Sequence, residues 1–197
     1  RQFAYSTDNH NTIDMVFSVN GIPVIALELK NQLTGQSVDN AKHQFMYDRD
    51  SKELIFNFNT RILAYFAVDL YEVAMTTHLR GKDTRFLPFN QGSNGAGNIG
   101  DGGNPVNPDG YATSYLWERV LNRDMLLSLL QRYISKITEE KISLVNGKQV
   151  KKKSTYLIFP RYHQLDVVEK LIADTKARTE GRNYLLQHSA GSGKSNS

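Results

Sequence analysis

Two acidic residues and a lysine are placed in the sequence where their side chains can act together. Glu28 and Lys30 alternate with two leucines, so in a β-strand the carboxylate and the ammonium lie on the same face. Asn20 and Gly21 form a two-residue turn signal between two apolar segments, which predicts a hairpin over residues 13–30. The turn brings Asp14, at the start of the first strand, back towards Glu28.

The chemistry of this group is that of a hard metal ion. Counting outward from the turn places Asp14 opposite Leu27, one step from Glu28. Two carboxylates and the backbone carbonyl of Leu29 supply the oxygen ligands that Mg²⁺ prefers. The neighbouring Lys30 can orient an attacking water or offset developing negative charge, so the group predicts metal-assisted hydrolysis.

A structural alternative stays open for the same residues. Charged side chains within an apolar strand are costly unless they are paired, so Glu28 and Lys30 could instead form a salt-bridged strand end. A second Glu-x-Lys triplet, Glu139 to Lys141, lies in a charged stretch after an amphipathic pattern, where we expect a solvated face.

A second motif near the other end of the chain is typical of phosphate binding. An apolar segment over 184–187 predicts a strand, and a glycine-rich run follows it. The candidate ATP-binding residues are Gly191, Gly193, Lys194 and Ser195. Converging backbone N–H groups, a lysine for the phosphates and a hydroxyl for Mg²⁺ are what a phosphate loop needs. The strict pattern has glycine where this chain has His188, and a flexible tail is the alternative.

The segments between these motifs predict an α/β core. Residues 38–51 suit a helix, and residues 54–58 and 62–68 suit buried strands, the second as in a sheet covered on both faces. Further helices are expected over 117–138 and 162–176.

Two irregular segments are also expected. Residues 88–110 hold seven of the fourteen glycines and three of the five prolines, which predicts a long loop, either functional or a family insertion. Lys151 to Lys153 indicates a solvated linker, with a DNA contact as the alternative. A soft domain boundary is expected near 145–155.

Composition excludes several classes of protein. The chain has 197 residues, 40% of them apolar, and no cysteine, so disulfide scaffolds and zinc-thiolate sites are excluded. The longest apolar run, residues 62–68, is far shorter than the ~20 residues of a membrane-spanning helix, and no signal sequence opens the chain, so we expect a soluble protein without a membrane partner. A net charge of +4 permits a polyanionic partner.

The first group of residues resembles the PD-(D/E)xK nuclease superfamily, with Asp14 as the motif aspartate and Glu28 to Lys30 as its ExK. The branch found in type I restriction enzymes adds a Q-x-x-x-Y element on a helix. Here Tyr47 fits it, whereas the glutamine position is His43 and Gln44 stands one place late. The resemblance implies catalytic roles for the three charged residues and Tyr47, and leaves open whether Gln44 or His43 fills the glutamine role.

The glycine-rich run is similar to motif I of superfamily 2 DNA translocases, and residues 159–164 look like the Q-motif of such motors, in which Gln164 would read the adenine edge. Gln164 could instead simply start a helix after Pro160. Together the motifs resemble the restriction (R) subunit of a type I restriction-modification enzyme. Two further stretches, 86–90 and 113–118, also resemble that family.

The resemblance implies a restriction-endonuclease-like mixed sheet flanked by helices over residues 1–150, followed over 151–197 by the start of a RecA-like P-loop domain. We therefore expect the front end of a larger bacterial or archaeal cytoplasmic enzyme that uses Mg²⁺ and ATP. It would cut double-stranded DNA remote from its recognition site, with methyltransferase (M) and specificity (S) subunits as partners. The alternatives are a docking module or a domain that only grips DNA for a motor.

Overall fold

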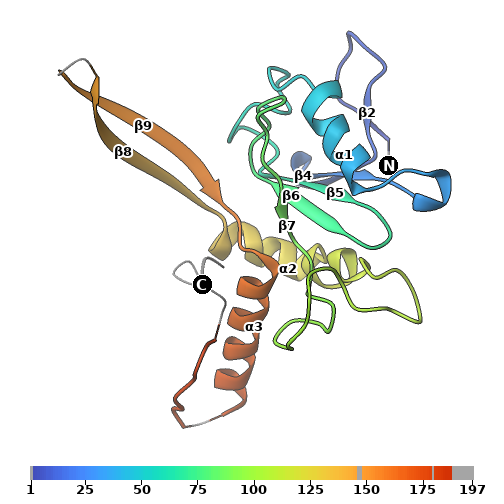
Figure 1. Ribbon diagram of the computed structural model, residues 1–197, viewed down its shortest axis with the longest axis vertical. Coiled ribbons are helices and arrows are strands. Elements are labelled where there is room, and N and C mark those ends of the chain that lie inside the picture. Colours follow the sequence, from blue (N-terminus) through green and yellow to red (C-terminus); the bar gives the residue numbers. More distant parts are fainter. Residues whose placement is uncertain (1, 146–147, 179, 188–197) are drawn as a thin grey trace.

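A five-stranded mixed sheet forms the centre of the fold. The computed structural model describes residues 2–145, 148–178 and 180–187 (Figure 1). The strands, in spatial order, are β3 (Met15–Val19), β4 (Ile22–Leu29), β5 (Ala64–Val68), β6 (Val73–Thr76) and β7 (Leu87–Pro88). Only β4 and β5 run parallel; the other neighbours are antiparallel. The predicted α/β class, with a mixed sheet flanked by helices, is confirmed.

Helices cover both faces of this sheet. One face carries α1 (Val38–His43) and the π-helical turn η2 (Gln44–Asp48). The other carries η3 (Leu116–Val120), α2 (Arg123–Ser128), η4 (Leu129–Tyr133) and the start of α3 (Tyr162–Ala177). Smaller elements are β1 (Phe3–Ala4), β2 (Thr12–Ile13) and the 3₁₀ turn η1 (Gln32–Thr34). A separate two-stranded ribbon, β8 (Ser135–Val145) with β9 (Lys148–Ile158), projects from the body (Figure 1).

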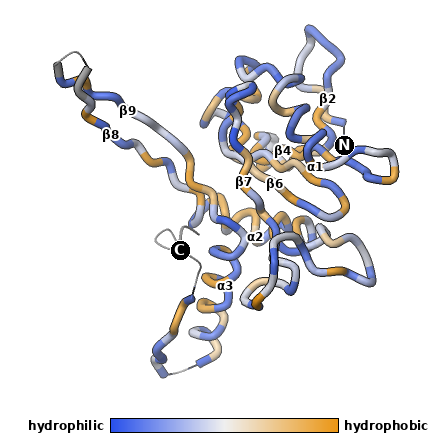
Figure 2. The backbone as a smooth tube through the Cα atoms, viewed as in Figure 1, coloured by the Kyte–Doolittle hydropathy of each residue, from blue (hydrophilic) through white to orange (hydrophobic). Residues whose placement is uncertain are grey.

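The core follows the alternation of side chains along the strands. In β4, Ile25 and Leu27 pack with the α2 and α3 side, whereas Ala26 packs with Ile13 and Phe45 on the α1 side. Hydrophobic segments gather accordingly in the central strands (Figure 2). Glu28 shares the face of Ala26, so the predicted alternation of charged and leucine side chains is confirmed and the carboxylate faces the α1 layer.

The predicted hairpin is confirmed, but its register differs by one residue from the expected pairing. Asn20 (φ 50°) and Gly21 (φ 81°) form the left-handed turn. A bulge between Phe17 and Ser18 shifts the pairing, so Met15 rather than Asp14 lies opposite Leu27. The shift moves Asp14 one position closer to Glu28.

The predicted strand over 54–58 is wrong, because this segment is a series of turns. The amide of Phe56 bonds the carbonyl of Glu53, and the amide of Thr60 bonds the carbonyl of Asn57. Asn59 adopts φ 59°, a conformation typical of turns. Ile55 and Phe56 are nevertheless buried. The neighbouring strand over 62–68 is confirmed as β5, which is buried throughout.

The predicted helix over 117–138 is wrong in its second part. It is interrupted at Asn122, whose side chain accepts from the amide of Met125 and starts α2 afresh. From residue 135 the chain is strand β8, favoured by the β-branched residues Ile137 and Thr138. The Glu139 to Lys141 stretch is solvated as expected, but it belongs to this strand.

Four further predictions about secondary structure have clear outcomes. Lys151 to Lys153 is not a linker but part of β9. The helix over 162–176 is confirmed as α3, and the long loop over 88–110 is irregular apart from the end of β7. The strand expected over 184–187 is wrong, since no neighbouring strand within the described residues pairs with it and Leu185 is 92% exposed. Within the described ranges, every helix is too short or too polar to cross a membrane.

Candidate active site

Glu28 is a fully buried carboxylate near the end of β4. Its Oε1 accepts from Arg49 Nη2 at 2.7 Å and from Arg49 Nε at 3.0 Å. Its Oε2 is buried and has no hydrogen-bond partner among the described residues. Arg49, itself 6% exposed, also donates to the carbonyl of Thr12 at 2.6 Å. One carboxylate oxygen is therefore anchored, and the other is left for a ligand or a proton.

Asp14 lies between β2 and β3, beside the end of β4. Its Oδ2 accepts from the amide of Leu29 at 2.8 Å, which ties the aspartate to the strand that carries Glu28. The amide of Lys30 in turn bonds the carbonyl of Val68 on β5. The backbone of the whole ExK segment is thus held between two neighbours, and the two carboxylates are brought together.

Burial has a larger effect on the electrostatics of Glu28 than its pairing with Arg49. Burial raises its pKa from 4.5 to about 7, in spite of the opposing effect of Arg49. The nearby Asp14 carboxylate raises the pKa of Glu28 further. A cation placed beside the two carboxylates would lower the pKa of Glu28 again, and a metal ion is one such cation.

We expect this pKa to be visible in the stability of the protein. Because the folded state holds the Glu28 proton up to about pH 7 while the unfolded chain releases it near 4.5, stability falls as pH rises through that window. The loss is about 3 kcal/mol in the free energy of unfolding. Urea titrations in EDTA at pH 5 and pH 8 check this, since Glu28→Gln must lack that part of the pH dependence. Equal pH dependence in both proteins would contradict it.

Lys30 and Gln44 meet at the edge of the same site. Lys30 Nζ donates to Gln44 Oε1 at 2.5 Å. His43 instead stacks on Tyr47, with ring centroids 4.4 Å apart, and the Tyr47 side chain is 58% exposed. The structure thus brings Gln44, not His43, to the lysine. It leaves Tyr47 at the surface.

The one-residue offset of the glutamine coincides with a change of helix type. The chain is α-helical as far as His43 and then continues as the π-helical turn η2, whose hydrogen bonds span one residue more. Single π-helical turns are frequent at functional sites. The backbone irregularity begins at Gln44, the residue that contacts Lys30.

The resemblance of residues 43–50 to the family's helical element extends to Arg49, but sequence reasoning did not predict that Arg49 contacts Glu28. Its 21-residue separation from Glu28 gives no local signal. The helix ends at Asp48, and Arg49 has extended backbone angles (φ −113°, ψ 112°), which turns its side chain into the core. A basic residue directly after a helix that packs on an acid-bearing strand is the signal that could have found it.

The candidate site offers a small hard cation two carboxylates and one backbone carbonyl as ligands. The described part of the chain contains no group of three or more His, Cys, Asp or Glu residues arranged around a metal position. The candidate ligands are therefore two carboxylates, Asp14 and Glu28, and the Leu29 carbonyl. Mg²⁺ is commonly held by one or two carboxylates while it keeps waters and phosphate oxygens. The unpartnered Oε2 of Glu28 is the observation that agrees with such a ligand set.

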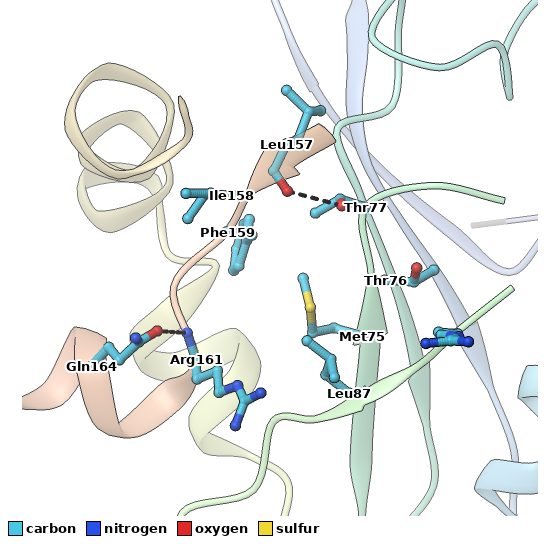
Figure 3. A pocket seen from close by; sticks show the side chains of 10 residues that line it. Met75, Thr76, Thr77, Leu87, Leu157, Ile158, Phe159, Arg161 and Gln164 are labelled. Carbon is cyan, nitrogen blue, oxygen red and sulfur yellow. Dashed lines mark hydrogen bonds between the residues drawn. The ribbon is translucent and has the colours of Figure 1, made fainter. Parts of the chain in front are cut away.

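The candidate ATP-binding residues fall largely outside what can be described. Gly191, Gly193, Lys194 and Ser195 lie beyond the described residues. Gln164 is 5% exposed, and its Oε1 accepts from the backbone amide of Arg161 at 2.8 Å, so it caps α3 (Figure 3). Its adenine-reading role stays a prediction.

Gln164 also lines a cavity of about 240 Å³ between β6, β9 and α3 (Figure 3). Met75, Leu157 and Phe159 line the apolar part of that cavity. The volume is below the roughly 300–1,000 Å³ of typical ligand sites.

The α/β fold, with two carboxylates and a lysine at the end of a strand, is the feature on which this chain can be compared with known proteins. Residues 1–84 match the family model described as the type I restriction enzyme R protein N terminus. No curated protein and no solved structure gave a significant match to the chain. The matched segment contains the candidate site and ends before the long loop.

Proposed function

We propose that this chain is the nuclease portion of an ATP-dependent type I restriction endonuclease, which hydrolyses phosphodiester bonds of double-stranded DNA. The observation that carries the proposal is the pair of carboxylates, Asp14 and buried Glu28, in which the Oε2 atom of Glu28 has no hydrogen-bond partner among the described residues. The family of residues 1–84 supports the same activity. In this proposal Asp14, Glu28 and the Leu29 carbonyl hold Mg²⁺.

Each side chain has a distinct task. A bound Mg²⁺ would polarise a phosphoryl oxygen and lower the pKa of a coordinated water. Lys30 orients the attacking water and offsets the growing negative charge. Arg49 fixes the Glu28 carboxylate so that only Oε2 faces the ligand. Gln44 holds the Lys30 ammonium in place. Tyr47, as an exposed side chain next to the site, is proposed to contact the DNA.

Gln44 and His43 should therefore differ in effect. We expect Gln44→Ala to lower the rate of DNA cleavage by the assembled enzyme about 10–100-fold, the range typical of residues that orient a catalytic group. His43→Ala, one residue away, should change the rate less than twofold, because its ring contacts Tyr47 and not Lys30. Single-turnover plasmid cleavage measures both. A larger loss for His43→Ala would assign the glutamine role to His43.

The Arg49 ion pair favours a second candidate function. Because Glu28 is already paired, the site could be a structural salt bridge within a docking or DNA-gripping domain. Titration calorimetry with Mg²⁺ or Mn²⁺ separates the two functions. The nuclease proposal expects binding that Glu28→Gln abolishes and that Glu180→Gln, an exposed control, leaves intact. Absence of Glu28-dependent binding would favour the docking function.

The finer features of the enzyme rest on the family and on the motifs together. We propose that residues 151–197 begin a translocating motor domain, in which Gln164 and the glycine-rich run bind ATP. We also propose assembly with methyltransferase (M) and specificity (S) subunits in the cytoplasm. The family match of residues 1–84 supports the assembly, and the motor rests on the sequence motifs alone.

A further inference from the structure

The ribbon formed by β8 and β9 carries the positive charge of the chain. Residues 135–158 contain six lysines and two glutamates, so the segment has a charge of +4, which equals the net charge of the whole chain. The rest of the protein is formally neutral. The ribbon also projects from the body in a direction away from the sheet (Figure 1).

The ribbon is a separate two-stranded sheet that does not pair with the central sheet. Its strands pair without interruption from Ser135 opposite Ile158 to Val145 opposite Lys148. At its base, Leu157 is buried and its carbonyl accepts from Thr77 Oγ1 at 3.2 Å. From residue 138 to 143 and from 149 to 154 every residue is exposed, on both faces. Eleven residues at about 3.4 Å each give a length of roughly 35 Å.

The lysines lie on both faces and are poorly compensated. Side-chain alternation places Lys151 and Lys153 on one face and Lys152 on the other. Lys153 pairs with Glu140 at 3.0 Å, whereas Lys151 and Lys152 have no ion pair among the described residues. Lys152 stands directly opposite Lys141, whose ammonium lies 4.0 Å from the Glu139 carboxylate. Like charges placed opposite each other destabilise a sheet, and the exposed Glu139 offsets only one of the two, so an anion from outside would stabilise the pair.

We propose that the β8–β9 ribbon is a DNA-binding arm that enters the major groove and contacts phosphates on both sides through Lys141, Lys151 and Lys152. The major groove, about 12 Å wide, admits a two-stranded ribbon, and charge on both faces matches the phosphates that line it. Lysines also protect exposed strand edges from aggregation, but that role does not require two of them to face each other. The inference rests on the proposed function, in which DNA is the substrate.

The test measures binding of the full 197-residue chain to a fluorescent 30-base-pair duplex in EDTA, across a series of salt concentrations. We expect Lys151→Gln/Lys152→Gln to weaken binding at least about tenfold at low salt. The slope of log affinity against log salt should fall by about 2, near 0.9 for each phosphate that the variant no longer neutralises. The control, Lys82→Gln/Lys176→Gln, removes the same charge from exposed positions outside the ribbon and should leave the slope unchanged.

Three outcomes would overturn the inference. These are unchanged binding by the ribbon variant, equal losses in both variants, and no DNA binding by the parent chain, which would favour an acidic protein partner for the ribbon. Because EDTA removes divalent cations, the binding measurement does not depend on DNA cleavage. Loss of binding by the ribbon variant with cleavage insensitive to Asp14→Asn would defeat the nuclease proposal alone. Normal binding with Asp14-dependent cleavage would defeat the ribbon alone.

Discussion

Glu28→Gln is expected to reduce DNA cleavage by the assembled enzyme at least about a thousandfold, which corresponds to roughly 4 kcal/mol in the activation barrier. The substitution keeps the size of the side chain but removes the negative charge that a cation needs. Asp14→Asn should have an effect of the same order, because both acids serve one ion. Plasmid linearisation under single-turnover conditions measures the rate.

The control for this prediction is Glu180→Gln, which neutralises an exposed glutamate far along the chain and should cut at the unsubstituted rate. Duplex binding, measured without divalent ions, should be unchanged in all three variants. Normal cleavage by both Glu28→Gln and Asp14→Asn would show that the carboxylate pair is a structural feature. A loss of duplex binding would instead place the defect before the chemical step.

Arg49→Met is expected to lower the free energy of unfolding by about 3–5 kcal/mol at pH 8, as for other broken buried ion pairs. Its removal leaves the Glu28 carboxylate buried without its cationic partner. The loss should be smaller at pH 5, where the raised pKa keeps Glu28 protonated. Urea unfolding at the two pH values measures both effects.

Arg178→Met provides the comparison, because Arg178 also forms an ion pair, 2.8 Å from Asp174, but on the surface. We expect Arg178→Met to destabilise the protein far less, because solvent screens an exposed pair of this kind. Equal destabilisation by the two substitutions, or an Arg49→Met protein as stable as the parent at pH 8, would mean that Arg49 does not compensate Glu28 in the fold.

Local patterns predicted the parts of the fold that depend on neighbours in the sequence. The Asn20-Gly21 turn requires positive φ at both residues, and both have it. Strand alternation placed Glu28 and Lys30 correctly. The predicted register is off by one, because no signal in the sequence marks the bulge after Phe17.

The errors arose where tertiary contacts decide between alternatives. The apolar residues over 54–58 are buried beneath turns, and a short apolar run does not distinguish a buried turn from a strand. Ile137 fits a helical spacing by coincidence, whereas the pairing of 135–145 with 148–158 makes it a strand residue. The Arg49 contact with Glu28 depends on where helix η2 ends, which the sequence does not mark.

The most direct test of a metal-dependent nuclease is exchange of the ligand at Asp14. The chain has no cysteine, so Asp14→Cys introduces its one thiol. A thiolate is a poor ligand for Mg²⁺ and a good one for softer cations. We predict that the assembled Asp14→Cys enzyme fails to cut DNA with Mg²⁺ and recovers cleavage with Mn²⁺ or Cd²⁺. Cleavage at the unsubstituted rate with Mg²⁺, or no recovery with any of these cations, would contradict a metal ion held by Asp14.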